Sequence, residues 1–158
     1  MVGEGLIVQL KSIAEFFERS TSCLSEEDSS FHSKEGTFTA AQQVAHTAQT
    51  IDWFIEGMFD VNGFDLDFEK HTKITMACDS LSSARESFSN AVANAIEVIG
   101  SKTDDELMQA LPQGPVMGGA PRVAVIGAVA DHTAHHRGAL TVYSRLLGKV
   151  PKMPYADM

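Results

Sequence analysis

Two histidines one helical turn apart are the residues of this sequence best suited to chemistry. His132 and His136 lie in the tract DHTAHHRG, and residues four apart share one face of a helix. Two imidazole nitrogens on one face can chelate a single divalent ion. The spacing therefore predicts a metal site, although histidines that only make structural hydrogen bonds also occur at this spacing.

His46 is the strongest candidate for a third ligand. It lies in a run, Gly36 to Ile51, without any Asp, Glu, Lys or Arg, which predicts a helix covered on more than one side. The face of this helix that carries His46 also holds Gln42, Thr50 and Trp53. The alternative is a buried histidine bonded to a neighbouring hydroxyl such as that of Thr50.

The other three histidines are less suited to the site. His32 and His71 stand at expected loop or helix-start positions, where a solvated side chain is the simpler interpretation. His135 is rotated away from the face that holds His132 and His136. We therefore leave these three out of the predicted ligand set.

Apolar periodicity predicts the helices that must position these residues. One amphipathic helix covers roughly the first 20 residues, and a second runs from the capping residue Thr39 to about Phe59. The cleanest pattern places Ile74, Ala77, Leu81, Ala84, Phe88, Ala91, Ala95 and Val98 in a third helix that ends near Gly100.

The end of the chain predicts a short helix and a fourth long one. Thr103 and Glu106 form a capping box that opens the short helix. Beyond Pro121, the inward stripe of the long helix is Val125, Val129, His132, His136, Leu140, Tyr143 and Leu147. Four long helices and no confident strand predict an all-α fold, a four-helix bundle with a short extra helix.

Length and charge limit the function classes. The 158 residues predict one domain, 1–158, large enough to fold without disulfides or a structural metal. A formal net charge of −9 argues against nucleic-acid binding. Two distant cysteines and the lack of a long uncharged apolar window predict a cytoplasmic protein that neither crosses nor binds a membrane.

Two stretches resemble the DinB-like (DinB/YfiT-like) family of metalloenzymes. DHTAHHRGALTVYSRLLGKVPKMPY is similar to the family's closing helix, HxxHHRGQL followed by a tyrosine, LG and a proline-containing tail. AAQQVAHTAQTIDWFIEGMF is similar to its earlier histidine helix, with an aromatic residue seven positions after the histidine. The sequence departs from the pattern at Ala139, where the family commonly has glutamine.

The resemblance implies a four-helix bundle in which His46, His132 and His136 hold a metal, often in a homodimer. Similar proteins include S-transferases and isomerases that use low-molecular-weight thiols. Three neutral nitrogens would leave a divalent ion an open position for water or thiolate. Zn²⁺ or Ni²⁺ is expected first, but imidazole ligands do not discriminate strongly among Zn, Ni, Cu and Fe, so the identity of the metal stays open.

The second helix also supports a homodimer. Its face opposite His46 carries Val44, Ala48, Ile51 and Ile55, and a helix with two faces to cover offers one of them to a partner subunit.

The favoured function is a metal-dependent enzyme acting on a small molecule, a thiol S-transferase or a hydrolase. Asp52, Glu56 and Asp131 are the carboxylates nearest the ligands in sequence, and none is an evident general base, which favours thiol transfer. No catalytic residue is assigned. The alternatives are a non-catalytic metal-binding stress-response protein and a bundle whose histidines are only structural.

Tyr143 is the candidate for the substrate side of the site. It lies on the inward stripe one to two turns beyond His136, where a phenol could hydrogen-bond to a bound group. The alternative is a core tyrosine whose hydroxyl reaches solvent.

Overall fold

The computed structural model describes residues 1–156 and confirms the all-α prediction. This part of the chain contains six α-helices and no strand. The helices are α1 (Val2–Thr21), α2 (Ala40–Phe59), α3 (Phe68–Met76), α4 (Leu81–Gly100), α5 (Asp104–Met108) and α6 (Ala124–Leu146). Among them, no helix has both the length and the hydrophobicity that crossing a bilayer requires.

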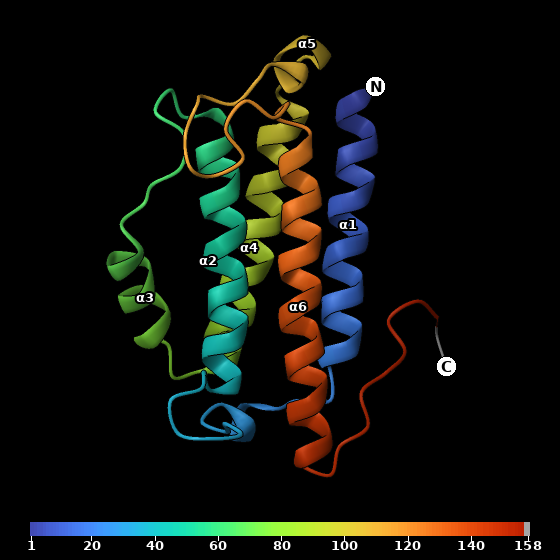
Figure 1. The fold of residues 1–158 in the computed structure, drawn as a ribbon. Helices are drawn as coiled ribbons and strands as arrows, with labels where there is room; N and C mark the ends of the chain where they lie inside the picture. Colours follow the sequence, from blue (N-terminus) through green and yellow to red (C-terminus); the bar gives the residue numbers. More distant parts are fainter. Residues whose placement is uncertain (157–158) are drawn as a thin grey trace.

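Four long helices form the bundle (Figure 1). Helices α1 and α2 each pack against both α4 and α6. The chain runs down α1, up α2, up α4 and down α6 in the view of Figure 1. Because α2 and α4 point the same way, residues 60–80 must return along the bundle, and they do so on the outer side of α2.

Helix α2 is covered on two sides by its own chain. Val44, Ala48, Ile51 and Ile55 are 0–2% exposed and belong to the bundle core. The opposite side faces α3 and α6, and Glu56 is the only residue of α2 classed as exposed. The apolar face that suggested a homodimer is therefore buried within the monomer, so it gives no support for an interface.

The predicted third helix is wrong at its beginning. The structure has two helices there, α3 and α4, separated at residues 77–80. Ile74 and Ala77 are exposed, although they continue the apolar period of α4. Residues 68–73, ahead of the predicted helix, are helical as well, because the Asp67 side chain accepts a hydrogen bond from the Lys70 backbone N–H and caps α3.

Hydrogen-bonding side chains explain why α4 begins at Leu81. The backbone N–H of Leu81 donates to Ser29 Oγ at 2.8 Å, and that of Ser82 donates to Glu26 Oε2 at 2.7 Å. The side chain of the N-cap residue, Ser80, accepts a hydrogen bond from the backbone N–H of Ser83. Helix N-termini need such acceptors, so caps from a distant turn override the local apolar period.

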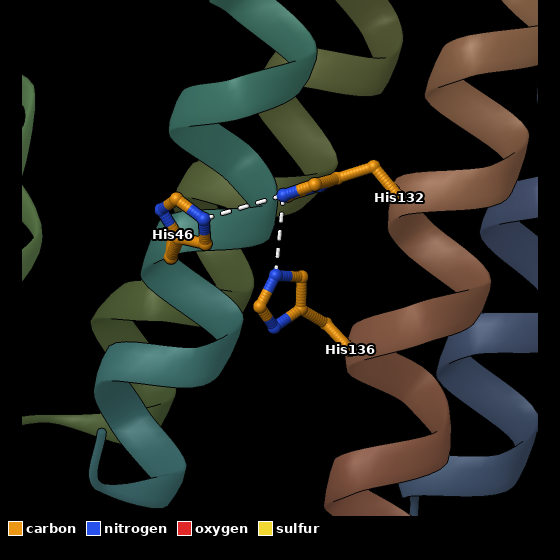
Figure 2. Close-up of side chains that lie close together, drawn as sticks. All are labelled: His46, His132 and His136. Carbon is orange, nitrogen blue, oxygen red and sulfur yellow. Dashed lines mark hydrogen bonds between the residues drawn. The ribbon is translucent and has the colours of Figure 1, made fainter. Parts of the chain in front are cut away.

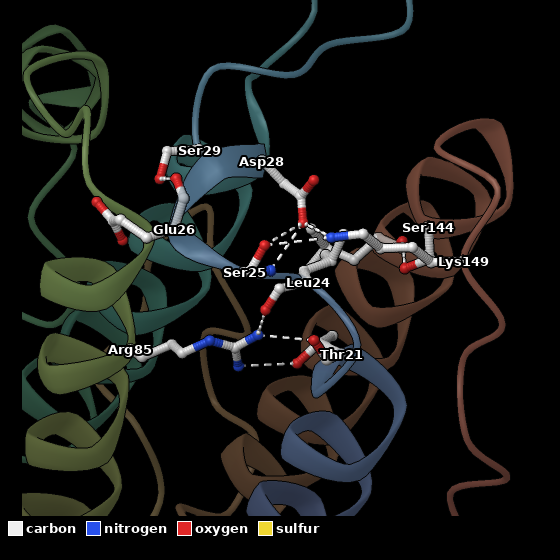
Figure 3. A network of polar contacts seen from close by, with 10 residues as sticks. Thr21, Leu24, Ser25, Glu26, Asp28, Ser29, Arg85, Ser144 and Lys149 are labelled. Carbon is white, nitrogen blue, oxygen red and sulfur yellow. Dashed lines mark hydrogen bonds and ion pairs between the residues drawn. The ribbon is translucent and has the colours of Figure 1, made fainter.

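Polar contacts also join the ends of α1, α4 and α6 (Figure 3). Arg85 of α4 donates to the carbonyl of Thr21 at 2.7 Å. Lys149, which follows α6, pairs with the buried carboxylate of Asp28. Burial alone raises the pKa of Asp28, but the hydrogen bonds and charge of Lys149, with the N–H and hydroxyl of Ser25, outweigh it and leave this pKa below 3.8.

Gly57 lets the returning chain approach α2. A Cβ at this position would lie 2.2 Å from Cδ1 of Phe64, so only glycine leaves room for that ring. Phe64 packs against Trp53 with ring centroids 4.9 Å apart, and Trp53 Nε1–H donates to the Asp65 carbonyl at 2.6 Å. These contacts place α3 beside the face of α2 that carries His46.

Candidate metal centre

Two antiparallel helices bring the three predicted ligands together (Figure 2). His46 projects from the middle of α2, and His132 and His136 project toward it from successive turns of α6. His132 Nε2 lies 3.2 Å from His46 Nε2 and 3.1 Å from His136 Nε2. One ligand nitrogen from each residue falls within 4.8 Å of the other two.

The hydrogen-bond partners of the rings indicate that these nitrogens suit a cation. His136 donates its Nδ1–H to Oε1 of Gln43 at 2.5 Å, so a neutral His136 keeps a lone pair on Nε2. A neutral His132 carries at most one hydrogen on Nε2 and cannot satisfy both neighbouring nitrogens. A tetrahedral ion with bonds of about 2.0–2.1 Å separates its ligands by about 3.3 Å, close to the two spacings that involve His132. The residues present therefore fit a transition metal.

Burial keeps the cluster neutral. It lowers the pKa of His132 to about 4, with smaller contributions from His46 and His135. Burial, followed by His132, likewise lowers the pKa of His136 to about 3. The pKa of His46 is also lowered, first by burial and then by His135. Neutral imidazoles are the form that binds metals, so the site is ready to bind at neutral pH.

Gln43 is a site residue that the sequence analysis missed. It lies on α2 one turn before His46, is 8% exposed, and fixes the tautomer of a ligand on another helix. Partners of this kind orient metal ligands in proteins. Its place in the charge-free run of α2 was the only sequence signal, and that signal does not separate it from Gln42 or Gln49.

A cavity of about 250 Å³ opens beside the cluster. His46 and His132 form part of its wall, and the rings of phenylalanine and tryptophan residues form about half of the rest. The cavity lies between α2, α3 and α6, whose residues supply nearly all of its lining. A small molecule could therefore reach the metal ligands from this side.

The interpretation of His71 as a solvated histidine is wrong. Its side chain is 15% exposed and lines the cavity together with His46 and His132. Its Nδ1 accepts a hydrogen bond from Gln49 Nε2 at 2.8 Å, and its Nε2 lies 3.2 Å from the Asp65 carboxylate. Helix α3, absent from the sequence prediction, carries it there.

The remaining candidates are not part of the cluster. His32, Asp131 and Glu56 are exposed. His135 is also exposed, although its ring centroid lies 4.9 Å from that of His136. Asp52 lines a different hollow, on the α4 side of α2, where burial raises its pKa. The described residues that line the cavity include no Asp or Glu.

Tyr143 contacts the site through another residue. Its ring is buried, and its hydroxyl donates to the Phe38 carbonyl at 2.7 Å instead of reaching solvent. The Phe38 ring lines the cavity and lies 5.2 Å from the His46 ring. A role for Tyr143 in shaping the substrate side thus remains a prediction, with Phe38 as the intermediary.

Fold and site together define an all-α bundle with a cluster of three histidines that could hold a metal. The model of the DinB family matches residues 12–158. The chain belongs to the DinB family.

Solved structures share this fold. A DinB-like protein from Bacillus cereus is 20% identical, with a TM-score of 0.74 over 98% of this chain and 97% of its own. YfiT from Bacillus subtilis is described as a probable metal-dependent hydrolase with an unusual four-helix bundle topology. It is 15% identical, with a TM-score of 0.68, and the match covers 93% of this chain and 88% of YfiT.

A third similar structure is a mutant of a mycothiol-dependent maleylpyruvate isomerase. It is 13% identical, with a TM-score of 0.73, and the match covers 87% of this chain but only 60% of the isomerase. These likenesses show the fold alone. No curated protein matches the sequence.

Proposed function

We propose that the protein is a metal-dependent enzyme acting on a small molecule, a thiol S-transferase or hydrolase in type. The observation that carries the proposal is the convergence of three neutral histidines, two of which, His46 and His132, line a cavity. Catalytic metal sites keep a position open for substrate or water. A cluster of three histidines that reaches the cavity through His46 and His132 provides such an arrangement.

His46, His132 and His136 would hold the ion, with Zn²⁺ or Ni²⁺ as the proposed metal. When bound, a divalent ion lowers the pKa of a coordinated water or thiol and provides a nucleophile at neutral pH. Gln43 holds the His136 ring so that Nε2 faces the other ligands. Because all three ligands are neutral, they leave the charge of the ion uncompensated.

Thiol transfer is favoured over hydrolysis by the composition of the cavity. Its described lining offers no carboxylate to act as a general base for water, whereas an acidic thiol needs less help with deprotonation. The mycothiol-dependent isomerase of similar fold supports a low-molecular-weight thiol as partner. A cytoplasmic location agrees with Cys23 and Cys78, which are both free thiols.

Cobalt substitution tests the proposal directly. Protein purified without an affinity tag of histidines should contain about one equivalent of transition metal. After exchange for Co²⁺, cysteine or glutathione should produce a sulfur-to-metal charge-transfer band that is absent in His136→Ala. An unchanged spectrum at millimolar thiol contradicts thiol transfer. Metal binding without turnover of any thiol-dependent substrate would instead support the alternative, a non-catalytic metal-binding stress-response protein.

A further inference from the structure

The cavity beside the metal centre has apolar walls. Trp53 and Phe54 of α2, Phe68 of α3 and Phe38 before α2 surround it. Its volume of about 250 Å³ is below the roughly 300–1,000 Å³ typical of sites for drug-sized ligands. The space therefore suits a molecule about the size of a single substituted ring, which the aromatic side chains would contact on several sides.

Apart from a metal ion held by the histidines, these walls offer no formal charge to a ligand. The described lining contains no Asp, Glu, Lys or Arg, and its polar groups other than histidine are Gln49, Thr50 and Thr72. An ionised group that enters such a space loses water without gaining a counter-charge. The side of the cavity away from the metal ligands therefore favours an uncharged body.

A chain of polar contacts fixes one amide in this wall. Lys70 Nζ lies 3.0 Å from the Asp65 carboxylate, which in turn lies 3.2 Å from His71 Nε2. His71 accepts one N–H of Gln49 at 2.8 Å. A primary amide has two N–H groups and a carbonyl with two lone pairs. Gln49 therefore keeps one donor and its acceptor for another partner.

The same contacts fix α3 as a wall. Besides the bond between Gln49 and His71, the Trp53 indole donates to the Asp65 carbonyl at 2.6 Å, and Gln42 donates to the Met76 carbonyl at 3.2 Å. The amide of Gln49 is thus held by His71, a residue of a helix that is itself fixed against α2. Such preorganised polar groups provide orientation in otherwise apolar sites.

We propose that this cavity takes an uncharged, ring-sized molecule bearing a carbonyl or amide group, and that Gln49 is the specificity-determining residue that binds this group. The inference rests on the proposed function, because it places the acceptor substrate next to the metal ligands. Selectivity would follow from the amide of Gln49 and the surrounding rings rather than from an ion pair.

Benzamide is a suitable probe, because it is an uncharged ring with a primary amide. Trp53 is the single tryptophan of the chain, so its indole N–H gives one assignable NMR signal in the cavity wall. In zinc-loaded protein, benzamide should shift this signal saturably. Gln49→Leu should weaken the binding about three- to tenfold, the amount expected from one lost hydrogen bond. Gln9→Leu, an exposed change on α1, should leave it unchanged.

Changing the charge of both the ligand and residue 49 tests whether Gln49 recognises the ligand or only supports the structure of the wall. Benzamidinium has the shape of benzamide and a positive charge, so the wild-type protein should bind it at least about tenfold more weakly. Gln49→Glu keeps the side-chain shape but adds a carboxylate, and it should reverse this preference. Benzoate is avoided, since a carboxylate also coordinates zinc directly.

Two results would overturn the inference: no saturable benzamide shift up to the solubility limit, or equal affinities in the wild type and both Gln49 variants. Zinc content and the cobalt–thiol band are measured on the same preparations. If they are normal while benzamide does not bind, the proposed function stands and the inference fails. If benzamide binds as expected but no metal is taken up, the proposed function fails instead.

Discussion

His136 and Gln43 form a 2.5 Å hydrogen bond between the Nδ1–H of the ring and the side-chain oxygen of the amide. This bond crosses from α6 to α2, so α2 supplies both the ligand His46 and the group that orients a ligand on the opposite helix. The two helices therefore depend on each other for the geometry of the site.

Removing this hydrogen bond should weaken metal binding. We expect Gln43→Leu to lower the affinity for zinc about 10- to 100-fold, since His136 is no longer held in the required tautomer. Competition with a chromophoric chelator measures the affinity. Gln9→Leu is the matched control, and an equal affinity in both variants would show that the orientation of His136 does not limit binding.

Each histidine of the cluster should be needed for metal but not for folding. We expect His46→Ala, His132→Ala and His136→Ala each to abolish stoichiometric binding while the helical circular dichroism stays intact, because the core is large enough without the ion. His32→Ala, His71→Ala and His135→Ala should retain the metal. Elemental analysis and circular dichroism check this series, and loss of helix on chelation would identify a structural metal instead.

Tyr143→Phe should act through Phe38. The change removes the hydrogen bond to the Phe38 carbonyl and should lower the free energy of unfolding by about 0.5–1.5 kcal/mol. Metal content should stay at the wild-type level, while any turnover weakens because a wall of the cavity is less well fixed. Urea denaturation and elemental analysis on one preparation test both parts, and loss of metal would contradict the indirect role.

The pair Asp28 and Lys149 should make stability depend on pH. The pKa of Asp28 lies below its ordinary value in the folded protein. The contribution of this carboxylate to the free energy of unfolding is therefore complete above the unfolded pKa of about 3.9. This contribution is lost as the pH falls through the lower folded pKa. Asp28→Asn should therefore reduce the free energy of unfolding at pH 6 more than at pH 2.5.

Denaturation in urea at both pH values measures this difference. Glu97→Gln, at an exposed position of α4, is the control and should leave the pH dependence of the wild type unchanged. If Asp28→Asn lowers the free energy of unfolding equally at both pH values, the charge of Asp28 does not contribute to stability.

The homodimer remains a prediction that needs its own measurement. The apolar face of α2 no longer supports it, because the monomer buries that face against its own helices. Light scattering at micromolar concentration decides the question, since one chain has a mass of 17.1 kDa. A mass near this value would reject the dimer.

Local periodicity determined much of this protein from sequence alone. The apolar stripes of α1, α2 and α6 follow one helical period, and a spacing of four residues places His132 and His136 on one face whatever surrounds them. Capping boxes at Thr39 and Thr103 marked helix starts correctly, because both partners lie within one turn. His46 was found because it shares the polar face of a charge-free helix and because of the family resemblance.

Only the tertiary structure decided what lies opposite each face. Ser80 is a local cap of α4, but the other two acceptors, Ser29 and Glu26, come from more than fifty residues away, so local sequence carries only part of the signal for the break between α3 and α4. Gln43 reaches His136 and Gln49 reaches His71 only because α2 packs against α6 and α3. A side-chain hydrogen bond between distant residues depends on how helices pack, and the period of one helix does not contain that information.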